Sequence, residues 1–164
     1  MTDGRGQWWR GARGEWYVVG QVALMLLIFF GPRRWGGWPA SALPLPTLRY
    51  VIGAIAVVYG AALFLAGILR LGRNLTPLPH PREGSTLVES GAYRLVRHPM
   101  YGGGLGVALG WVLIVGSFLT LAYAVLLFIF MDIKSRREER WLTEKFPGYA
   151  DYQRRVRRLV PFIY

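Results

Sequence analysis

Residues 99–131 read PMYGGGLGVALGWVLIVGSFLTLAYAVLLFIFM and contain no charged residue over 33 positions. A single membrane helix needs only about 20 apolar residues, so this stretch is too long for one crossing. Gly116-Ser117 lies near its middle and supplies a break. The stretch therefore predicts a helical hairpin, with one arm from Tyr101 to Val115 and the other from Phe118 to Lys134.

Two further uncharged runs precede this hairpin, over residues 16–32 and 50–69, and they are 17 and 20 residues long. At about 1.5 Å per residue, such runs approach the roughly 30 Å thickness of the hydrocarbon core of a bilayer. The expected fold is all-α, a polytopic membrane protein with about four transmembrane helices. We expect one domain over residues 1–164, with an N-terminal pair of helices at 1–71 and the remainder at 72–164.

The first run has an alternative interpretation as a secretory signal peptide. Arg5, Arg10 and Arg13 precede it, and Ala40-Ser41-Ala42 resembles a cleavage site. That triplet lies far beyond the end of the apolar stretch, so a retained helix is the simpler interpretation.

The distribution of positive charge indicates the orientation. The chain has 20 Lys and Arg residues against 9 Asp and Glu, a formal net charge of +11. If both termini are cytoplasmic, 17 of the basic residues face the cytoplasm and 3 face outward. We therefore expect a multi-pass protein of the bacterial inner membrane whose basic face attracts anionic lipid, with no nucleic-acid partner. With no cysteine and two histidines, a metal site is not expected.

The polar segment before the hairpin, residues 72–104, has prolines at 77, 79 and 81, which exclude a regular helix at its start. Its later half brings four side chains to the mouth of the hairpin, where they can bind an anionic carboxylate together with a planar ring. They are Tyr93, Arg97, His98 and Tyr101. The plainer alternative is that Arg97 reaches lipid headgroups and His98 begins a helix whose first turn holds Pro99.

The second polar segment, residues 132–164, continues the last membrane helix. Glu138 and Glu139 lie there among arginines, which is also typical of a solvated, salt-bridged helix. Pro147-Gly148 breaks the helix, and then Tyr149, Tyr152, Val156 and Leu159 recur at helical spacing. This spacing predicts an amphipathic helix that folds back over the cytosolic mouth.

Four motifs together resemble the isoprenylcysteine carboxyl methyltransferase family of integral-membrane methyltransferases, particularly its short bacterial members. They are GAYRLVRHPMYGG at 91–103, REERWL at 137–142, FPGYxxYxxxV at 146–156 and VPFI at 160–163. The resemblance covers about residues 71–163 and makes 72–164 the cofactor-binding catalytic core.

The resemblance implies S-adenosylmethionine as cofactor, enclosed by the C-terminal segment, and a lipophilic, isoprenoid- or lipid-like acceptor that enters from the bilayer. We expect methylation at a carboxylate of this acceptor, while the sequence leaves an amine nitrogen or a thiol sulfur open as the nucleophilic atom. The resemblance also implies Arg155, Glu139 and Arg97 as catalytic residues, with Arg155 near the acceptor. Glu139 would contact the polar end of the cofactor, and Glu138 would matter less because adjacent helical residues point about 100° apart. The implied cofactor-binding residues are Leu87, Val88, Gly91, Tyr93, Val96, Arg97, His98, Pro99, Tyr101, Gly102, Glu138, Glu139 and Leu142.

Two other functions stay open at this point. Membrane sterol reductases that use NADPH look similar in their own RHPxYxG region, although Trp141-Leu142 follow the glutamates here in place of their acidic-cysteine motif. A non-catalytic membrane interaction protein, with a basic face that only binds lipid, is the second alternative.

Overall fold

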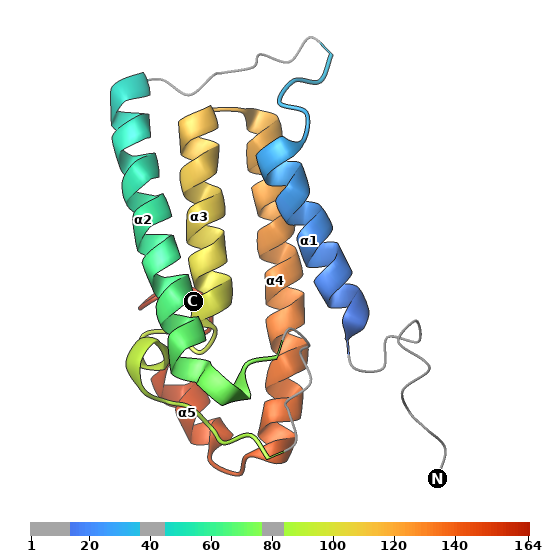
Figure 1. Ribbon diagram of the computed structural model, residues 1–164, viewed down its shortest axis with the longest axis vertical. Helices are drawn as coiled ribbons and strands as arrows, with labels where there is room; N and C mark the ends of the chain where they lie inside the picture. Colours follow the sequence, from blue (N-terminus) through green and yellow to red (C-terminus); the bar gives the residue numbers. More distant parts are fainter. Residues whose placement is uncertain (1–13, 37–44, 77–83) are drawn as a thin grey trace.

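A computed structural model describes residues 14–36, 45–76 and 84–164 (Figure 1). These residues form helices and connecting segments, with no β-strand among them. The elements in chain order are α1 (Glu15–Phe30), α2 (Pro46–Leu71), η3 (Gly72–Asn74), η4 (Gly91–Arg94), α3 (Pro99–Val115), α4 (Phe118–Lys145) and α5 (Tyr149–Arg155). The prolines at 77, 79 and 81 and the triplet at 40–42 lie outside the described residues.

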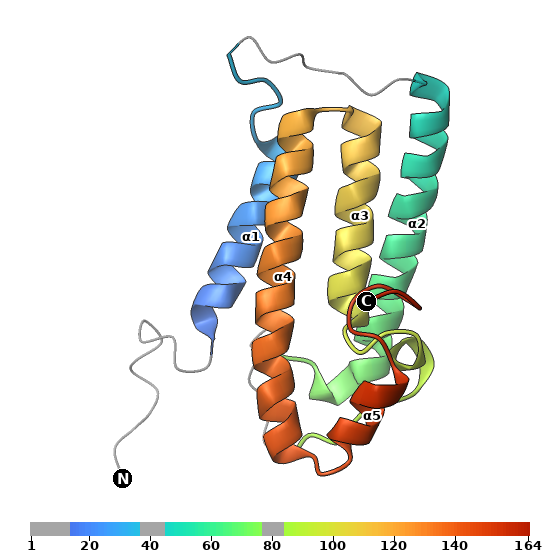
Figure 2. The ribbon, with the colours of Figure 1, turned by 180° about the vertical axis from the view of Figure 1, so that it is seen from behind.

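Helices α2, α3 and α4 run side by side, and α1 crosses α4 obliquely, while the short α5 lies across the end of the bundle where α2 and α4 finish (Figures 1 and 2). The predicted hairpin is confirmed. Gly116 ends α3 in the left-handed conformation at φ 70°, and the hydroxyl of Ser117 accepts a hydrogen bond from the backbone N–H of Thr120 at 3.3 Å to start α4. The predicted break at Pro147-Gly148 separates α4 from α5.

Two of the described helices are long and apolar enough to cross a membrane, one over Pro46–Asn74 and the other over Phe118–Lys145. Helices α1 and α3 are apolar but shorter, at 16 and 17 residues. Helix α4 has 28 residues, and 28 residues extend about 42 Å against a hydrocarbon core of roughly 30 Å. Its last turns, from Asp132 on, therefore continue past the apolar part and carry the glutamate pair.

Helices α2 and α3 pack backbone against backbone along a row of glycines. Gly53, Gly60 and Gly67 recur every seven residues on the face of α2 that contacts α3. A Cβ atom on Gly60 would lie 2.6 Å from the carbonyl oxygen of Gly103, and one on Gly110 would lie 2.5 Å from that of Gly53. Such close approach is possible only without side chains, so this row fixes the two helices that form one wall of the site.

The segment after α5 differs from the prediction. The helical spacing was expected to continue to Leu159, but α5 ends at Arg155. The chain then lies parallel to the segment before α3: the backbone N–H of Arg97 donates to the carbonyl of Arg157 at 2.8 Å, and that of His98 donates to the carbonyl of Arg158 at 3.0 Å. The prediction of one longer helix was wrong because these backbone hydrogen bonds replace the next helical turn.

Candidate functional site

A cavity of about 340 Å³ extends through the bundle from α1 to α5. This volume lies within the roughly 300–1,000 Å³ that is usual for small-molecule sites. At the α5 end its wall is polar, with Arg97, His98, Glu138, Tyr149 and Tyr152, which we call the polar chamber. Towards the middle of the bundle the wall is made by Val18, Met25, Phe64, Ile68 and Met100, which we call the apolar arm.

Nine of the predicted cofactor-binding residues line this cavity, and four do not. The nine are Leu87, Val88, Tyr93, Arg97, His98, Pro99, Tyr101, Glu138 and Leu142. The four that are not part of the wall are Gly91, Val96, Gly102 and Glu139, and Arg155 is also absent from it.

Glu138 is held at the wall of the polar chamber by its neighbours. The hydroxyl of Tyr101 donates to Glu138 Oε2 at 2.8 Å. The His98 ring stacks parallel on that of Tyr101, with centroids 5.3 Å apart, and His98 Nδ1 lies 3.8 Å from the same carboxylate oxygen. The three side chains form one fixed surface with a carboxylate facing the cavity, which suits it to accept hydrogen bonds from a ligand.

Glu139 lies one residue further along α4 and is at the centre of a buried network. Its Oε1 accepts a hydrogen bond from Arg97 Nε at 2.8 Å and lies 3.1 Å from His98 Nε2. Its Oε2 accepts from Gln153 Nε2 at 3.1 Å and from Arg158 Nε at 3.2 Å. Sequence reasoning gave Glu139 the cofactor contact and Glu138 the smaller role, whereas the structure places Glu138 on the cavity and Glu139 behind it.

Arg97 connects this network to the C-terminal segment. Its Nη1 donates to the carbonyl oxygens of Gln153 and Val156, the first at 3.0 Å. With its Nε on Glu139, the guanidinium is fixed in one orientation while part of it faces the cavity. Arg97 is therefore a preorganised cation, as binding of a carboxylate requires.

Two tyrosines of α5 cover the polar chamber, and their hydroxyls differ. That of Tyr152 donates to the carbonyl of Tyr93 at 2.6 Å. The hydroxyl of Tyr149, a residue that is 1% exposed, has no hydrogen-bond partner among the described residues. Burial raises the pKa of both hydroxyls, so both stay protonated and able to donate. An unsatisfied buried donor on a cavity wall is costly unless a ligand pairs with it.

Three predicted residues shape the backbone around the site. Val96 is fully buried in a small core with Leu63 and Ala92. Gly91 has φ +63°, a conformation that side chains rarely adopt. A Cβ on Gly102 would lie 2.3 Å from the carbonyl oxygen of Leu159, so glycine there lets the C-terminal segment approach α3.

Arg155 does not reach the cavity. Its Nη2 donates to Glu89 Oε2 at 2.8 Å, and its side chain is 64% exposed. The helix ends at this residue, and the side chain runs along the outside of α5 towards the loop before η4. The position therefore gives no support to the catalytic role that the resemblance implied for it.

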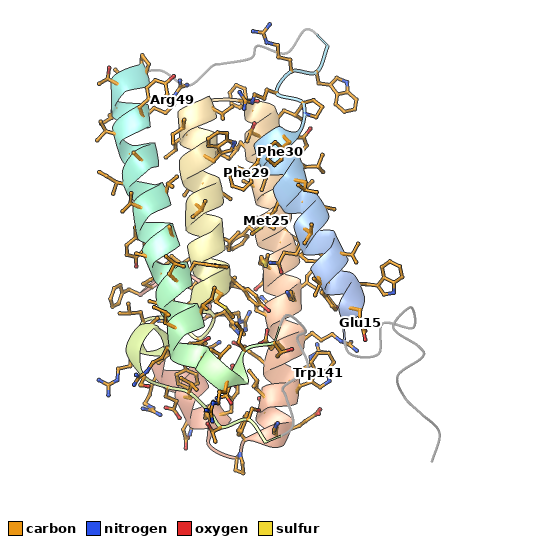
Figure 3. All side chains as sticks on the ribbon, viewed as in Figure 1. Glu15, Met25, Phe29, Phe30, Arg49 and Trp141 are labelled. Carbon is orange, nitrogen blue, oxygen red and sulfur yellow. The ribbon has the colours of Figure 1, made fainter. Side chains whose placement is uncertain are left out.

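Sequence reasoning missed the contribution of the first two helices and of Lys134. Val18, Gln21 and Met25 of α1 line the cavity, and Figure 3 shows Met25 projecting from α1 towards the helices it crosses. Lys134 Nζ donates to Gln21 Oε1 at 2.6 Å. The one available signal was its spacing, since Lys134 precedes Glu138 by one helical turn and so shares its face.

Comparisons with known proteins identify similar methyltransferases. The family model for phospholipid methyltransferase matches residues 48–148. A cobalt-zinc-cadmium resistance protein, CzcN, of Cupriavidus metallidurans is 34% identical over 90% of this chain and 62% of its own length. A probable protein-S-isoprenylcysteine O-methyltransferase of Oryza sativa subsp. indica is 30% identical over 68% of the chain and 61% of its own length. Protein-S-isoprenylcysteine O-methyltransferase B of Arabidopsis thaliana is 32% identical over 68% of the chain and 58% of its own length. The chain thus spans about six tenths of the length of these relatives.

Proposed function

The chain belongs to the phospholipid methyltransferase family, and from that premise we propose that it is an integral-membrane methyltransferase that uses S-adenosylmethionine and acts on a lipophilic acceptor. The observation that carries this proposal is the continuous cavity that joins the polar chamber to the apolar arm. A charged cofactor and a lipid-like acceptor need such different surroundings within one site.

The residues on the wall fit the cofactor chemically. S-adenosylmethionine presents a carboxylate, an ammonium group, ribose hydroxyls, an adenine ring and a sulfonium. Arg97 is a fixed donor for the carboxylate, and Glu138 is an acceptor for the ammonium or ribose hydroxyls. The Tyr149 hydroxyl, which has no hydrogen-bond partner among the residues that the structure describes, is a further donor, and the tyrosine rings stabilise a sulfonium by cation–π attraction. Leu87, Val88 and Leu142 are apolar surface for the adenine.

When bound, the cofactor supplies an electrophilic methyl group, whose carbon bonds to an acceptor lone pair while the carbon–sulfur electron pair stays on a neutral thioether. Such a transfer needs little acid–base chemistry from the protein. The chain's own residues hold the reactants in line and keep water out. Glu139 acts as a positioning residue that fixes Arg97 and His98 behind the cavity wall, and α5 covers the polar chamber.

The proposed arrangement in the membrane has four crossing helices, α1 to α4, and both termini in the cytoplasm of a bacterial inner membrane. The partition of basic residues, 17 against 3, supports this orientation. It places the polar chamber at the cytoplasmic end, where the cofactor is available. The division into an N-terminal pair at 1–71 and a core at 72–164 stays a prediction, with α1 and α2 as part of the site's wall.

The proposed acceptor is an isoprenoid- or lipid-like molecule that is methylated at a carboxylate. Two observations support it: the relatives include proteins named for isoprenylcysteine, and the apolar arm lies between apolar helices. No comparison favours the reductase alternative.

Methyl transfer can be tested with radiolabelled cofactor. The purified chain is incubated with tritiated-methyl S-adenosylmethionine and either S-farnesylcysteine or a bacterial lipid extract, and the product is treated with alkali. A methyl ester releases volatile tritiated methanol, whereas methyl groups on nitrogen or sulfur stay in the product. Volatile counts that disappear in Arg97→Ala support the proposal. Label fixed only in alkali-stable form contradicts the carboxylate assignment, and no incorporation with either acceptor preparation counts against the function.

A further inference from the structure

A buried lysine lies on the cavity wall where the polar chamber meets the apolar arm. Lys134 is 2% exposed. Its Nζ donates to Gln21 Oε1 at 2.6 Å and lies 4.8 Å from the centre of the Tyr101 ring. The ion pairs found among the described residues do not include Lys134. The ammonium group is therefore held by a neutral amide and an aromatic face.

Lys134 lies one helical turn before Glu138 along α4, next to the residues of the apolar arm. Met131, Lys134, Glu138 and Leu142 all line the cavity and form one stripe along the helix. Lys134 precedes Glu138 by four residues, a separation of about 6 Å along the helix axis. Its partner Gln21 lies on α1 between Val18 and Met25, which line the apolar arm. The ammonium group thus lies at the inner end of the polar chamber.

Arg97 and Lys134, two cations on the described cavity wall, differ in their hydrogen-bond partners. Arg97 already has the Glu139 carboxylate and two backbone carbonyls as partners. The hydrogen bond that the structure shows for the Lys134 ammonium goes to the Gln21 amide, a neutral acceptor that is weaker than a carboxylate, and the Glu138 carboxylate acts on it only through space from one helical turn away. A buried charge without a counter-ion in direct contact is costly, and in a membrane protein such a residue marks a functional site. An anionic group that replaced the Gln21 oxygen would compensate the charge.

We propose that Lys134 binds the anionic head of the acceptor, with Gln21 holding the ammonium group in place until that head arrives. The acceptor's tail then lies in the apolar arm, and its head faces the polar chamber. This assigns to Lys134 the acceptor-recognition role that the resemblance gave to Arg155. It rests on the proposed function only in calling the bound amphiphile an acceptor, because recognition of the head needs no methyl transfer.

Binding of a matched pair of amphiphiles tests the proposal. The chain is placed in nanodiscs of neutral phosphatidylcholine and titrated with dansyl-labelled undecanoic acid or with its methyl ester, and empty nanodiscs correct for partition into lipid. We expect the acid to bind about tenfold or more tightly than the ester, because a charge-assisted hydrogen bond contributes about a decade of affinity. Lys134→Met should remove this preference, and Lys134→Arg should keep most of it. Gln21→Ala should keep or raise it, since the competing acceptor is gone.

Affinity for S-adenosylmethionine, measured on the same variants, separates this proposal from the proposed function. Lys134→Met should leave the affinity for S-adenosylmethionine within about twofold of the parent chain, because the proposal gives Lys134 no hydrogen bond to the cofactor. Loss of even one charge-assisted hydrogen bond to the cofactor would cause a larger change. Equal binding of acid and ester to the parent chain overturns the proposal, as does an unchanged preference in Lys134→Met. A large loss of cofactor affinity in Lys134→Met, with the acid preference intact, assigns the lysine to the cofactor instead. Failure of the parent chain to bind S-adenosylmethionine counts against the proposed function and leaves the acid-to-ester ratio interpretable.

Discussion

Glu139 on α4 and Arg97 in the segment before α3 form an ion pair, with 2.8 Å between Oε1 and Nε, and their side chains are 4% and 8% exposed. Arg97 also donates to two carbonyls of the C-terminal segment. The pair therefore joins three segments that are distant in sequence. The polar chamber has its shape only when all three meet.

The adjacent glutamates should separate stability from binding. Glu139→Gln leaves Arg97 buried without its counter-ion and should lower the free energy of unfolding by about 3 kcal/mol, as is usual when one partner of a buried pair is removed. Glu138→Gln, at a position that is 23% exposed, should leave stability nearly unchanged and weaken S-adenosylmethionine binding about tenfold. Thermal unfolding in detergent and cofactor titration measure the two effects. The opposite pattern, with binding lost only in Glu139→Gln, would favour the assignment made from sequence.

Two tyrosine variants test the unpartnered hydroxyl. Tyr149→Phe removes a buried donor that has no hydrogen-bond partner in the described part of the chain, so thermal stability without ligand should stay the same or rise. The stabilisation produced by added S-adenosylmethionine should become smaller. Tyr152→Phe is the matched control: it loses the hydrogen bond to the Tyr93 carbonyl and should lower stability by about 1 kcal/mol. A clear destabilisation in Tyr149→Phe, with the ligand effect unchanged, would show that this hydroxyl serves the fold alone.

Arg155 and Glu89 form an exposed pair whose coupling should be small. A double-mutant cycle on Arg155→Ala and Glu89→Ala should give about 0.2–1 kcal/mol, the range for solvent-exposed ion pairs. Arg155→Ala should keep most of the methyl-transfer activity of the parent chain, whereas Arg97→Ala should lose it. Arg154→Ala is the control, and its activity should equal that of Arg155→Ala. If Arg155→Ala alone loses activity while cofactor affinity is unchanged, the acceptor contact implied by the resemblance is correct and Lys134 is not the recognition residue.

The positions of the four long helices and of the two breaks could be predicted from the sequence because they depend on local features. The uncharged runs located α1 to α4, and Gly116-Ser117 and Pro147-Gly148 located the breaks. Which of the two glutamates, Glu138 or Glu139, faces the cavity could not be predicted in this way. Adjacent residues of a helix point about 100° apart, so the two glutamates cannot share one direction. Only the rotation of α4 about its own axis relative to its neighbours decides which glutamate faces the cavity.

The parts of the site that were missed depend on tertiary contacts. Val18, Gln21 and Met25 carry no motif, and they line the cavity because α1 crosses the α3–α4 pair. The early end of α5 follows from the hydrogen bond between Arg97 and Arg157, whose partners are 60 residues apart in the sequence. Helical spacing in the C-terminal segment holds no information about such a partner.

The proposed orientation can be measured by labelling of single cysteines, since the chain has none of its own. Trp35 lies in the exposed connection after α1, and Arg154 lies on the exposed side of α5, so Trp35→Cys and Arg154→Cys are suitable variants. An impermeant maleimide added to intact cells should label the first and not the second, because positive residues concentrate on the cytoplasmic side. Labelling of Arg154→Cys alone would invert the topology and place the polar chamber outside the cytoplasm.

Calorimetric titration of the purified chain in detergent measures whether the cavity binds S-adenosylmethionine. S-adenosylmethionine and NADPH are titrated separately into the parent chain and into Glu138→Gln. We expect saturable binding of S-adenosylmethionine at one site per chain, weakened about tenfold by Glu138→Gln, as for the loss of one charge-assisted hydrogen bond, and no saturable binding of NADPH. Saturable binding of NADPH, with none of S-adenosylmethionine to the folded chain, would contradict the proposed function.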